Sequence, residues 1–149
     1  IEDSAAANAK KKITIGNLPV SGMVAKSFEI NTTDATQTSF GALFTPAAGS
    51  ANLCNIRVLS VEQAAGGGDW ASFQFLGCVI EDCDSNGVFE GHNTTVSSAP
   101  DNSQGVDGAA IRLAVLADGS AGLVVKITAI AGANYRHRLV LEYSSLVYS

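Results

Sequence analysis

The segment with the clearest chemical pattern is the acidic run from Asp82 to Gly87. It places oxygen-bearing side chains at alternate positions, Asp82, Asp84 and Asn86, and a glycine at the sixth position. Hard cations such as Ca²⁺ bind several oxygens that converge on one point, and calcium loops open with this spacing. The twelfth position, which should supply a bidentate glutamate, holds Asn93 instead. The run therefore predicts either a polar hairpin turn closed by Asn86-Gly87 or a calcium site at Asp82, Asp84 and Asn86 of roughly millimolar affinity.

Two histidines are the next candidates for chemistry. His92 stands two residues after Glu90 on one face of an expected strand, and this spacing allows the two side chains to interact. His137 falls on the apolar face of the last expected strand, which favours a hydrogen-bonded core residue. No nucleophile elbow, phosphate-binding loop or HExxH motif accompanies either histidine. We therefore expect no catalytic residues and no enzymatic activity.

Three cysteines, Cys54, Cys78 and Cys83, cannot all pair within one chain. Cys54 lies in a strand pattern and is predicted to be a small buried apolar residue. Cys78 and Cys83 are close enough in sequence to bridge a hairpin; the alternative is that both stay free. Zinc is not expected, because the chain has no CxxC pair and its histidines are far apart in sequence. No cofactor is predicted.

The elements that must position these residues are strands, because apolar residues recur with a period of two along most of the chain. In the last third, residues 111–117, 123–129 and 135–143 each have one apolar face, which predicts three antiparallel strands in a meander. The strands expected before them are Ile13–Leu18, Met23–Asn31, Thr38–Phe44, Asn52–Ala64, Trp70–Asp82 and Val88–Val96. About eight or nine strands with Gly-rich turns and no helix predict an all-β fold, an antiparallel two-sheet β-sandwich of jelly-roll type.

Length and composition fit one domain. The chain has 149 residues, of which 46% are hydrophobic and only 15% are charged, against about 25% charged in an average protein. We divide it into a flexible N-terminal arm, residues 1–12, and a β-sandwich domain, residues 13–149. The net charge of −5 argues against nucleic-acid binding, and no apolar run reaches the roughly 20 residues of a membrane span. The arm ends in Lys10-Lys11-Lys12, which suits either solvation or contact with an acidic neighbour.

Taken in order, three segments resemble a known family: Asn31–Thr38, Asp69–Phe75 after the triple glycine, and Gly122–Leu146. The family is the β-sandwich domain at the C-terminus of many tailed-bacteriophage virion proteins, among them tail fibres, baseplate proteins and head or neck appendages. Lys126-Ile127-Thr128 and Gly132 match its closing pattern, whereas Tyr135 stands where a tryptophan is expected. The resemblance implies a structural module that is often trimeric and carries no catalytic residues.

The sequence and the resemblance together suggest a non-enzymatic structural component of a phage virion: a small fibre, an appendage or a capsid-decorating subunit. Its expected partners are copies of itself, with a trimer favoured, and other virion proteins contacted through residues 1–12. The alternative is a carbohydrate-binding or receptor-binding β-sandwich that engages a host-surface glycan. Trp70, beside the triple glycine, would then stack on a sugar; otherwise it packs in the core.

Overall fold

The chain folds as a sandwich of two antiparallel β-sheets. The computed structural model describes residues 23–148, and within them it has ten strands and one short helix, α2 (Gly105–Ala110). The strands are β1 (Val24–Thr32), β2 (Thr38–Ser39), β3 (Ser50–Glu62), β4 (Trp70–Glu81), β5 (Glu90–His92), β6 (Thr95–Ser98), β7 (Asn102–Gln104), β8 (Arg112–Asp118), β9 (Gly122–Thr128) and β10 (Tyr135–Val147). The expected all-β sandwich is confirmed. The arm at residues 1–12 and the strand expected at 13–18 lie outside the described residues.

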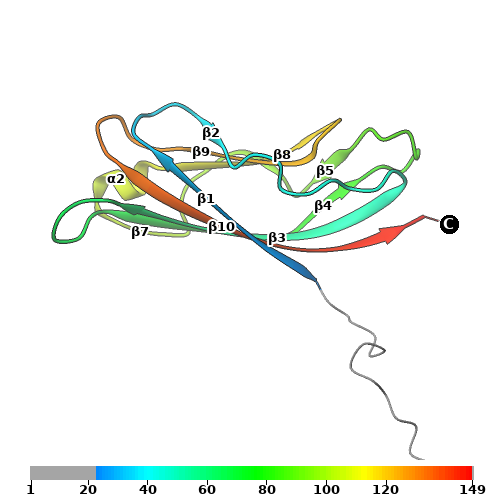
Figure 1. Cartoon of the computed structure of the whole chain (residues 1–149), viewed down its shortest axis with the longest axis horizontal. Helices are drawn as coiled ribbons and strands as arrows, with labels where there is room; N and C mark the ends of the chain where they lie inside the picture. The colour runs from blue at the N-terminus through cyan, green and yellow to red at the C-terminus, as the bar shows by residue number, and fades with distance from the viewer. Residues whose placement is uncertain (1–22, 149) are drawn as a thin grey trace, which may run out of the picture.

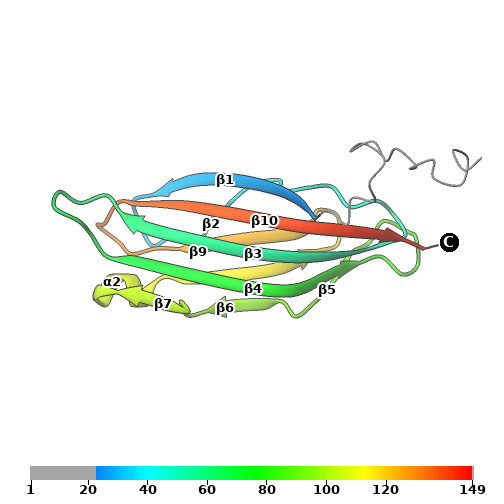
Figure 2. The same cartoon turned by 90° about the horizontal axis from the view of Figure 1, so that it is seen from below.

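The two sheets differ in size. The larger sheet has the order β1-β10-β3-β4-β5, with β7 also paired to β4, and the smaller has the order β2-β9-β8-β6. Figure 1 shows the two layers stacked, and Figure 2 looks onto the larger sheet, with β1, β10, β3 and β4 side by side along the length of the domain. The first strand pairs with the last and the second with the last but one, the nested order of a jelly roll, whereas β3–β4 and β8–β9 are hairpins within one sheet.

The core lies between the sheets and follows from strand alternation. In β10 the buried residues are the odd-numbered ones from Tyr135 to Leu141, and in β3 they are the even-numbered ones from Ser50 to Ser60. Leu139 and Leu141 of β10 lie opposite Val58 and Ile56 of β3, and all four side chains are buried. Fully burying such a side chain contributes about 1.5–3 kcal/mol, so the alternation decides which face of each sheet packs inward.

The last three strands do not form the expected meander. β8 and β9 pair in the smaller sheet, with Leu113 opposite Ile127, but β10 crosses to the larger sheet and lies between β1 and β3. The apolar faces assigned from the sequence are confirmed, because Ile127 and Leu139 are both buried. Periodicity identifies the buried face of a strand but not the sheet that the strand joins, since both sheets of a sandwich have the same period.

Two other strands are shorter than expected. β2 ends at Ser39, and the next residues form a loop that buries Phe40, Leu43 and Phe44 in the core. The single strand expected at residues 88–96 splits at Asn93, whose φ of 55° turns the chain. As a result β5 pairs with β4 in the larger sheet, while β6 pairs with β8 in the smaller one.

Helix α2 is not predicted from the sequence, from which no helix is expected. Asp69 caps this helix from a distant part of the chain: its Oδ2 accepts hydrogen bonds from the backbone N–H of Asp107 at 3.0 Å and of Gly108 at 3.4 Å. Six residues give no periodic apolar face, so the helix depends on this tertiary contact. Residues 23–148 contain no helix that is long and apolar enough to cross a membrane.

Tyr135 has an unusual position in the core. Its side chain is 1% exposed, and within the described residues its hydroxyl is the buried side-chain group that has no hydrogen-bond partner. Burial raises the pKa of this hydroxyl to about 12, and the charges of Glu62, Asp69 and Asp107 act in the same direction. An unpaired buried hydroxyl lowers the free energy of unfolding.

We therefore expect Tyr135→Phe to leave the free energy of unfolding unchanged or to raise it, by up to about 1 kcal/mol, as measured by urea denaturation. The control is Tyr148→Phe, which removes an exposed hydroxyl that donates to Glu81 at 3.1 Å and should give no stabilisation. A loss of 2 kcal/mol or more in Tyr135→Phe would show that the hydroxyl is hydrogen-bonded in solution.

Candidate functional site

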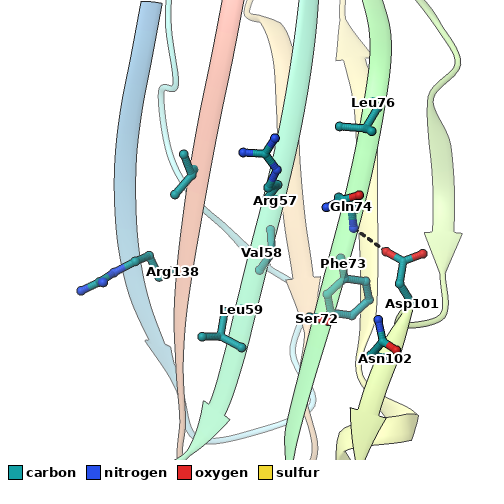
Figure 3. Close-up of a pocket in the computed structure, with 11 residues that line it drawn as sticks. Arg57, Val58, Leu59, Ser72, Phe73, Gln74, Leu76, Asp101, Asn102 and Arg138 are labelled. Carbon is teal, nitrogen blue, oxygen red and sulfur yellow. Dashed lines mark hydrogen bonds between the residues drawn. The ribbon is translucent and has the colours of Figure 1, made fainter.

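The outer face of the larger sheet carries an open trough of about 620 Å³. It lies over β3 and β4 and extends to β10 on one side and to the loop before β7 on the other (Figure 3). The residues that line it are Arg57, Val58, Leu59, Ser72, Phe73, Gln74, Leu76, Asp101, Asn102, Arg138 and Val140. It combines an apolar floor with charged and amide side chains, a composition that suits contact with another molecule.

Two leucines form the exposed apolar part of the floor. Leu59 of β3 is 49% exposed and Leu76 of β4 is 58% exposed. Leu76 faces outward with Ser72 and Gln74 by the normal alternation of β4. A β-bulge begins at this point: Leu76 and Gly77 together lie opposite Asn55, and Gly77 has a φ of 75°. The amide of Asn55 stabilises the bulge, since its Oδ1 accepts the N–H of Gly77 at 2.9 Å.

This apolar floor is not among the features predicted from the sequence. The signal was present in the apolar pairs Val58-Leu59 and Phe75-Leu76, which interrupt the alternation of β3 and β4. A strand with apolar side chains on both faces is usually covered on both faces. Within residues 23–148 nothing covers Leu59 and Leu76 on the outer face, and exposed apolar groups of this kind mark interaction surfaces.

One wall of the trough is the chain around Asp101. Its backbone N–H donates to the carbonyl of Ser72 at 2.8 Å. Its Oδ2 accepts the backbone N–H of Gln74 at 2.5 Å, the bond drawn as a dashed line in Figure 3. These two bonds fasten the loop to the edge of β4 between β5 and β7. The Asp101 side chain therefore brings a negative charge to this side of the trough at a fixed position.

The opposite flank is rich in arginine. Arg136 and Arg138 of β10 both donate hydrogen bonds to Glu29 of β1, Arg136 Nε at 3.1 Å and Arg138 Nε at 2.6 Å. Arg57 of β3 pairs with Glu142 of β10 at 3.5 Å. The hydrogen bonds from Arg136 and Arg138 lower the pKa of the Glu29 carboxyl. Three arginines against two glutamates make this flank positive, and the flank at Asp101 is negative.

The acidic run Asp82–Gly87, expected to form a turn or a calcium site, lies in the eight-residue loop between β4 and β5. Asp82 is 1% exposed, and its carboxylate accepts backbone N–H bonds from Gly49 at 3.1 Å, from Asn86 at 3.2 Å and from Gly87 at 2.6 Å. The Asn86 Oδ1 accepts the N–H of Val88 at 2.9 Å. Two of the three predicted ligands therefore use their oxygens to hold the loop.

The run does form the polar loop of a hairpin between β4 and β5, but Asn86 and Gly87 do not form the type I′ turn expected to close it. Such a turn needs a positive φ at both residues, and the positive φ angles are at Ser85 and Gly87. Asp84, the third predicted ligand, is exposed. Across residues 23–148, no group of three or more His, Cys, Asp or Glu side chains is arranged to hold a metal ion.

His92 does not pair with Glu90. Its Nε2 lies 2.5 Å from Oε1 of Glu81, because His92 is opposite Val79 in the ladder and Glu81 is the diagonal neighbour. Glu81 also accepts a hydrogen bond from Tyr148. The pKa of Glu81 is lowered by hydrogen bonds from Cys83 and Tyr148, and by His92 to a smaller degree. This carboxylate lies between the thiol and the imidazole, so it gives no support to a Cys–His nucleophilic pair.

His137 is a hydrogen-bonded core residue, as expected. Its Nδ1 lies 2.7 Å from the Ser60 hydroxyl, and its Nε2 lies 2.8 Å from the Thr32 hydroxyl. The imidazole and the Ser60 side chain are fully buried, and Thr32 is 4% exposed. The distances are those of a Ser–His pair, but the site has no exposed surface through which a substrate could reach it. Burial lowers the pKa of His137 to about 4.

The two remaining sequence candidates are also placed. The Cys78–Cys83 bridge is not formed: Cys78 is buried in β4, Cys83 is exposed, and both thiols are free. The side chain of Trp70 lies on the outer face of β4 and is partly buried. Its indole N–H donates to Oε1 of Gln104 at 2.6 Å. It is therefore neither a core residue nor part of the trough.

Comparison of the chain with family models, with curated proteins and with solved structures finds no match.

Proposed function

We propose that the chain is a non-enzymatic structural subunit of a phage virion that assembles with copies of itself, most simply as a trimer. The observation that carries self-assembly is the outer face of the larger sheet, where Leu59 and Leu76 are about half exposed between charged flanks. An apolar centre with an arginine-rich polar rim is the usual composition of a protein–protein interface. The assignment to a virion rests on the family resemblance of the sequence together with the β-sandwich fold.

The two flanks of the face favour a second copy as the occupant. The arginine flank follows β10 and β3, and the flank of Asp101 follows the far edge of β4. When three copies turn this face toward a common axis, the arginine flank of one lies beside the Asp101 flank of the next. The leucines then lie near the axis, away from water. This cyclic arrangement satisfies both flanks of every copy with one repeated contact.

The leucine contact makes a direct prediction. The chain is expected to be an oligomer at micromolar concentration, and the double variant Leu59→Ser, Leu76→Ser should be monomeric by light scattering and sedimentation. Because both side chains are about half exposed, their loss should leave the thermal midpoint of the monomer little changed. The matched control is Val96→Ser, since Val96 is 75% exposed but lies in β6 of the smaller sheet.

Charge exchange tests the orientation of the contact. Asp101→Lys should weaken assembly, and adding Arg138→Glu should restore it by reversing both flanks. Asp101→Asn is the control for the hydrogen bond that Asp101 accepts from Gln74.

A monomeric parent chain up to millimolar concentration would contradict self-assembly, whereas an oligomer that survives the leucine double variant would contradict only this face. Imaging of native phage particles with an antibody to the chain tests the virion assignment.

A second candidate function is glycan binding in the same trough. Gln74, Asp101 and Asn102 offer donors and acceptors beside an apolar floor, which is the chemistry that recognises sugar hydroxyls. A glycan array probed with the parent chain and with the variant Asn102→Ala tests it. Retention of glycans by the parent but not by the variant would favour this function over self-assembly.

A further inference from the structure

We propose that Cys54 and Cys78 form an intramolecular disulfide when the chain folds in an oxidising environment. The two residues lie directly opposite each other in the antiparallel ladder of β3 and β4. Both side chains are fully buried, so both point into the core from the same face of the sheet. The pair differs from the Cys78–Cys83 bridge that the sequence spacing allows.

The position of the two residues in the ladder is one that a disulfide can span. Residues directly opposite each other in an antiparallel pair have Cα atoms about 4.5–5.5 Å apart, and disulfides join Cα atoms about 4.4–6.8 Å apart. The ladder shifts register immediately after Cys54, at the bulge that contains Gly77. A bulge gives local freedom to the backbone, which helps the two sulfur atoms to adopt the required dihedral angle.

The thiols themselves have only weak alternative partners. Sγ of Cys54 lies 3.7 Å from the carbonyl of Asn52, and Sγ of Cys78 lies 3.4 Å from the carbonyl of Asn93. Burial raises the pKa of the Cys54 thiol to about 12, and the neighbouring Cys78 acts in the same direction. The attacking species in disulfide exchange is the thiolate, so the folded reduced protein should react slowly, and the bond should form during folding.

The reaction needs a low-molecular-weight disulfide as oxidant. One cysteine thiolate of the chain attacks a sulfur of oxidised glutathione, and one glutathione thiolate leaves. The second cysteine thiolate then attacks the mixed disulfide, and the second glutathione thiolate leaves. In sum, two protein thiols lose two protons and two electrons, and one glutathione disulfide is reduced to two glutathione thiols. The bond would close the β3–β4 hairpin in the centre of the larger sheet.

The test refolds the full chain carrying Cys83→Ser from denaturant in a mixture of oxidised and reduced glutathione. We expect an intact mass lower by two hydrogen atoms, a Cys54–Cys78 linked peptide in a non-reduced digest, and a thermal midpoint higher by roughly 5–10 °C than after reduction. The control adds Cys78→Ser, which should give either a free Cys54 thiol or a single glutathione adduct, with no loss of two hydrogen atoms, no linked peptide and no rise in the midpoint. Two free thiols after oxidative refolding, or an oxidised protein with a lower midpoint, would overturn the proposal.

Discussion

Acidification from pH 7 to pH 4 is expected to lower the free energy of unfolding by roughly 3 kcal/mol through His137 alone. The imidazole is fully buried between Ser60 and Thr32, and its ring stacks on that of Tyr135 at 6.0 Å. A neutral imidazole donates from one nitrogen and accepts at the other, and a hydroxyl group can take either role. The neutral ring therefore fits this site, and a charged ring would have to be buried without a carboxylate partner.

The direction of the effect follows from the lowered pKa. Burial brings the pKa of His137 from 6.5 to about 4 in the folded state, so the unfolded chain binds the proton more readily. The stabilisation is complete above pH 6.5 and is lost as the pH falls toward 4. Each pKa unit corresponds to about 1.4 kcal/mol, which gives the expected size.

Urea denaturation at half-unit steps between pH 7 and pH 4 measures the effect. His137→Gln should be less stable at pH 7 because it cannot keep both hydroxyl contacts, but its stability should change little between pH 6.5 and pH 5. Carboxylates with lowered pKa values, such as Glu29, titrate mainly below that range. The comparison variant is His92→Gln, at the exposed histidine of β5, in which the loss of stability that depends on His137 should persist. An unchanged pH profile in His137→Gln would contradict the assignment.

The sequence predicted the fold because the buried face of each long strand is a local property. Residues at a period of two, such as Leu123, Val125 and Ile127, are buried wherever the strand is placed in the sandwich. Sheet membership is not local, because it depends on which connection turns back and which crosses between sheets. At Asn93 the chain leaves the larger sheet for the smaller one, and before β10 it returns to the larger sheet. Neither change of sheet produces a periodic signal in the sequence.

The candidate site was harder to predict for the same reason. The trough joins residues of β3, β4 and β10 with the loop at Asp101, and those segments meet only after the sheet is ordered. The same reason applies to the partners of His137. Its position on the apolar face of the strand predicted that it is buried, but its partners Ser60 and Thr32 are 77 and 105 residues away in the chain. The acidic run Asp82–Gly87 has a clear local pattern, but the pattern is ambiguous. The same spacing of carboxylate and amide side chains occurs in metal-binding loops and in loops whose side chains accept hydrogen bonds from backbone N–H groups.

The loop after β4 gives the second prediction with a large effect. Asp82→Ala is expected to lower the thermal midpoint by roughly 10 °C, because three backbone N–H groups, those of Gly49, Asn86 and Gly87, lose their common acceptor in a buried position. Gly49 immediately precedes β3, whereas Asn86 and Gly87 belong to the loop after β4, so Asp82 also ties the start of β3 to this loop. Although burial acts to raise the pKa of Asp82, hydrogen bonds from Gly49 and Gly87 outweigh it and lower the pKa. Its stabilising effect is therefore present above its unfolded pKa and lost in stronger acid.

Three measurements separate this structural role from calcium binding. Asp84→Ala, at the exposed member of the predicted ligand set, should shift the midpoint by less than about 2 °C, and Asp82→Asn should fall between Asp82→Ala and the parent chain because one acceptor oxygen remains. EDTA should leave the midpoint of the parent chain unchanged, since the Asp82 oxygens are already bonded to the backbone. A large loss of stability in EDTA that calcium restores and Asp84→Ala abolishes would instead identify a metal site. The comparison is decisive because a backbone acceptor requires Asp82 alone, whereas a calcium ion requires Asp82, Asp84 and Asn86 together.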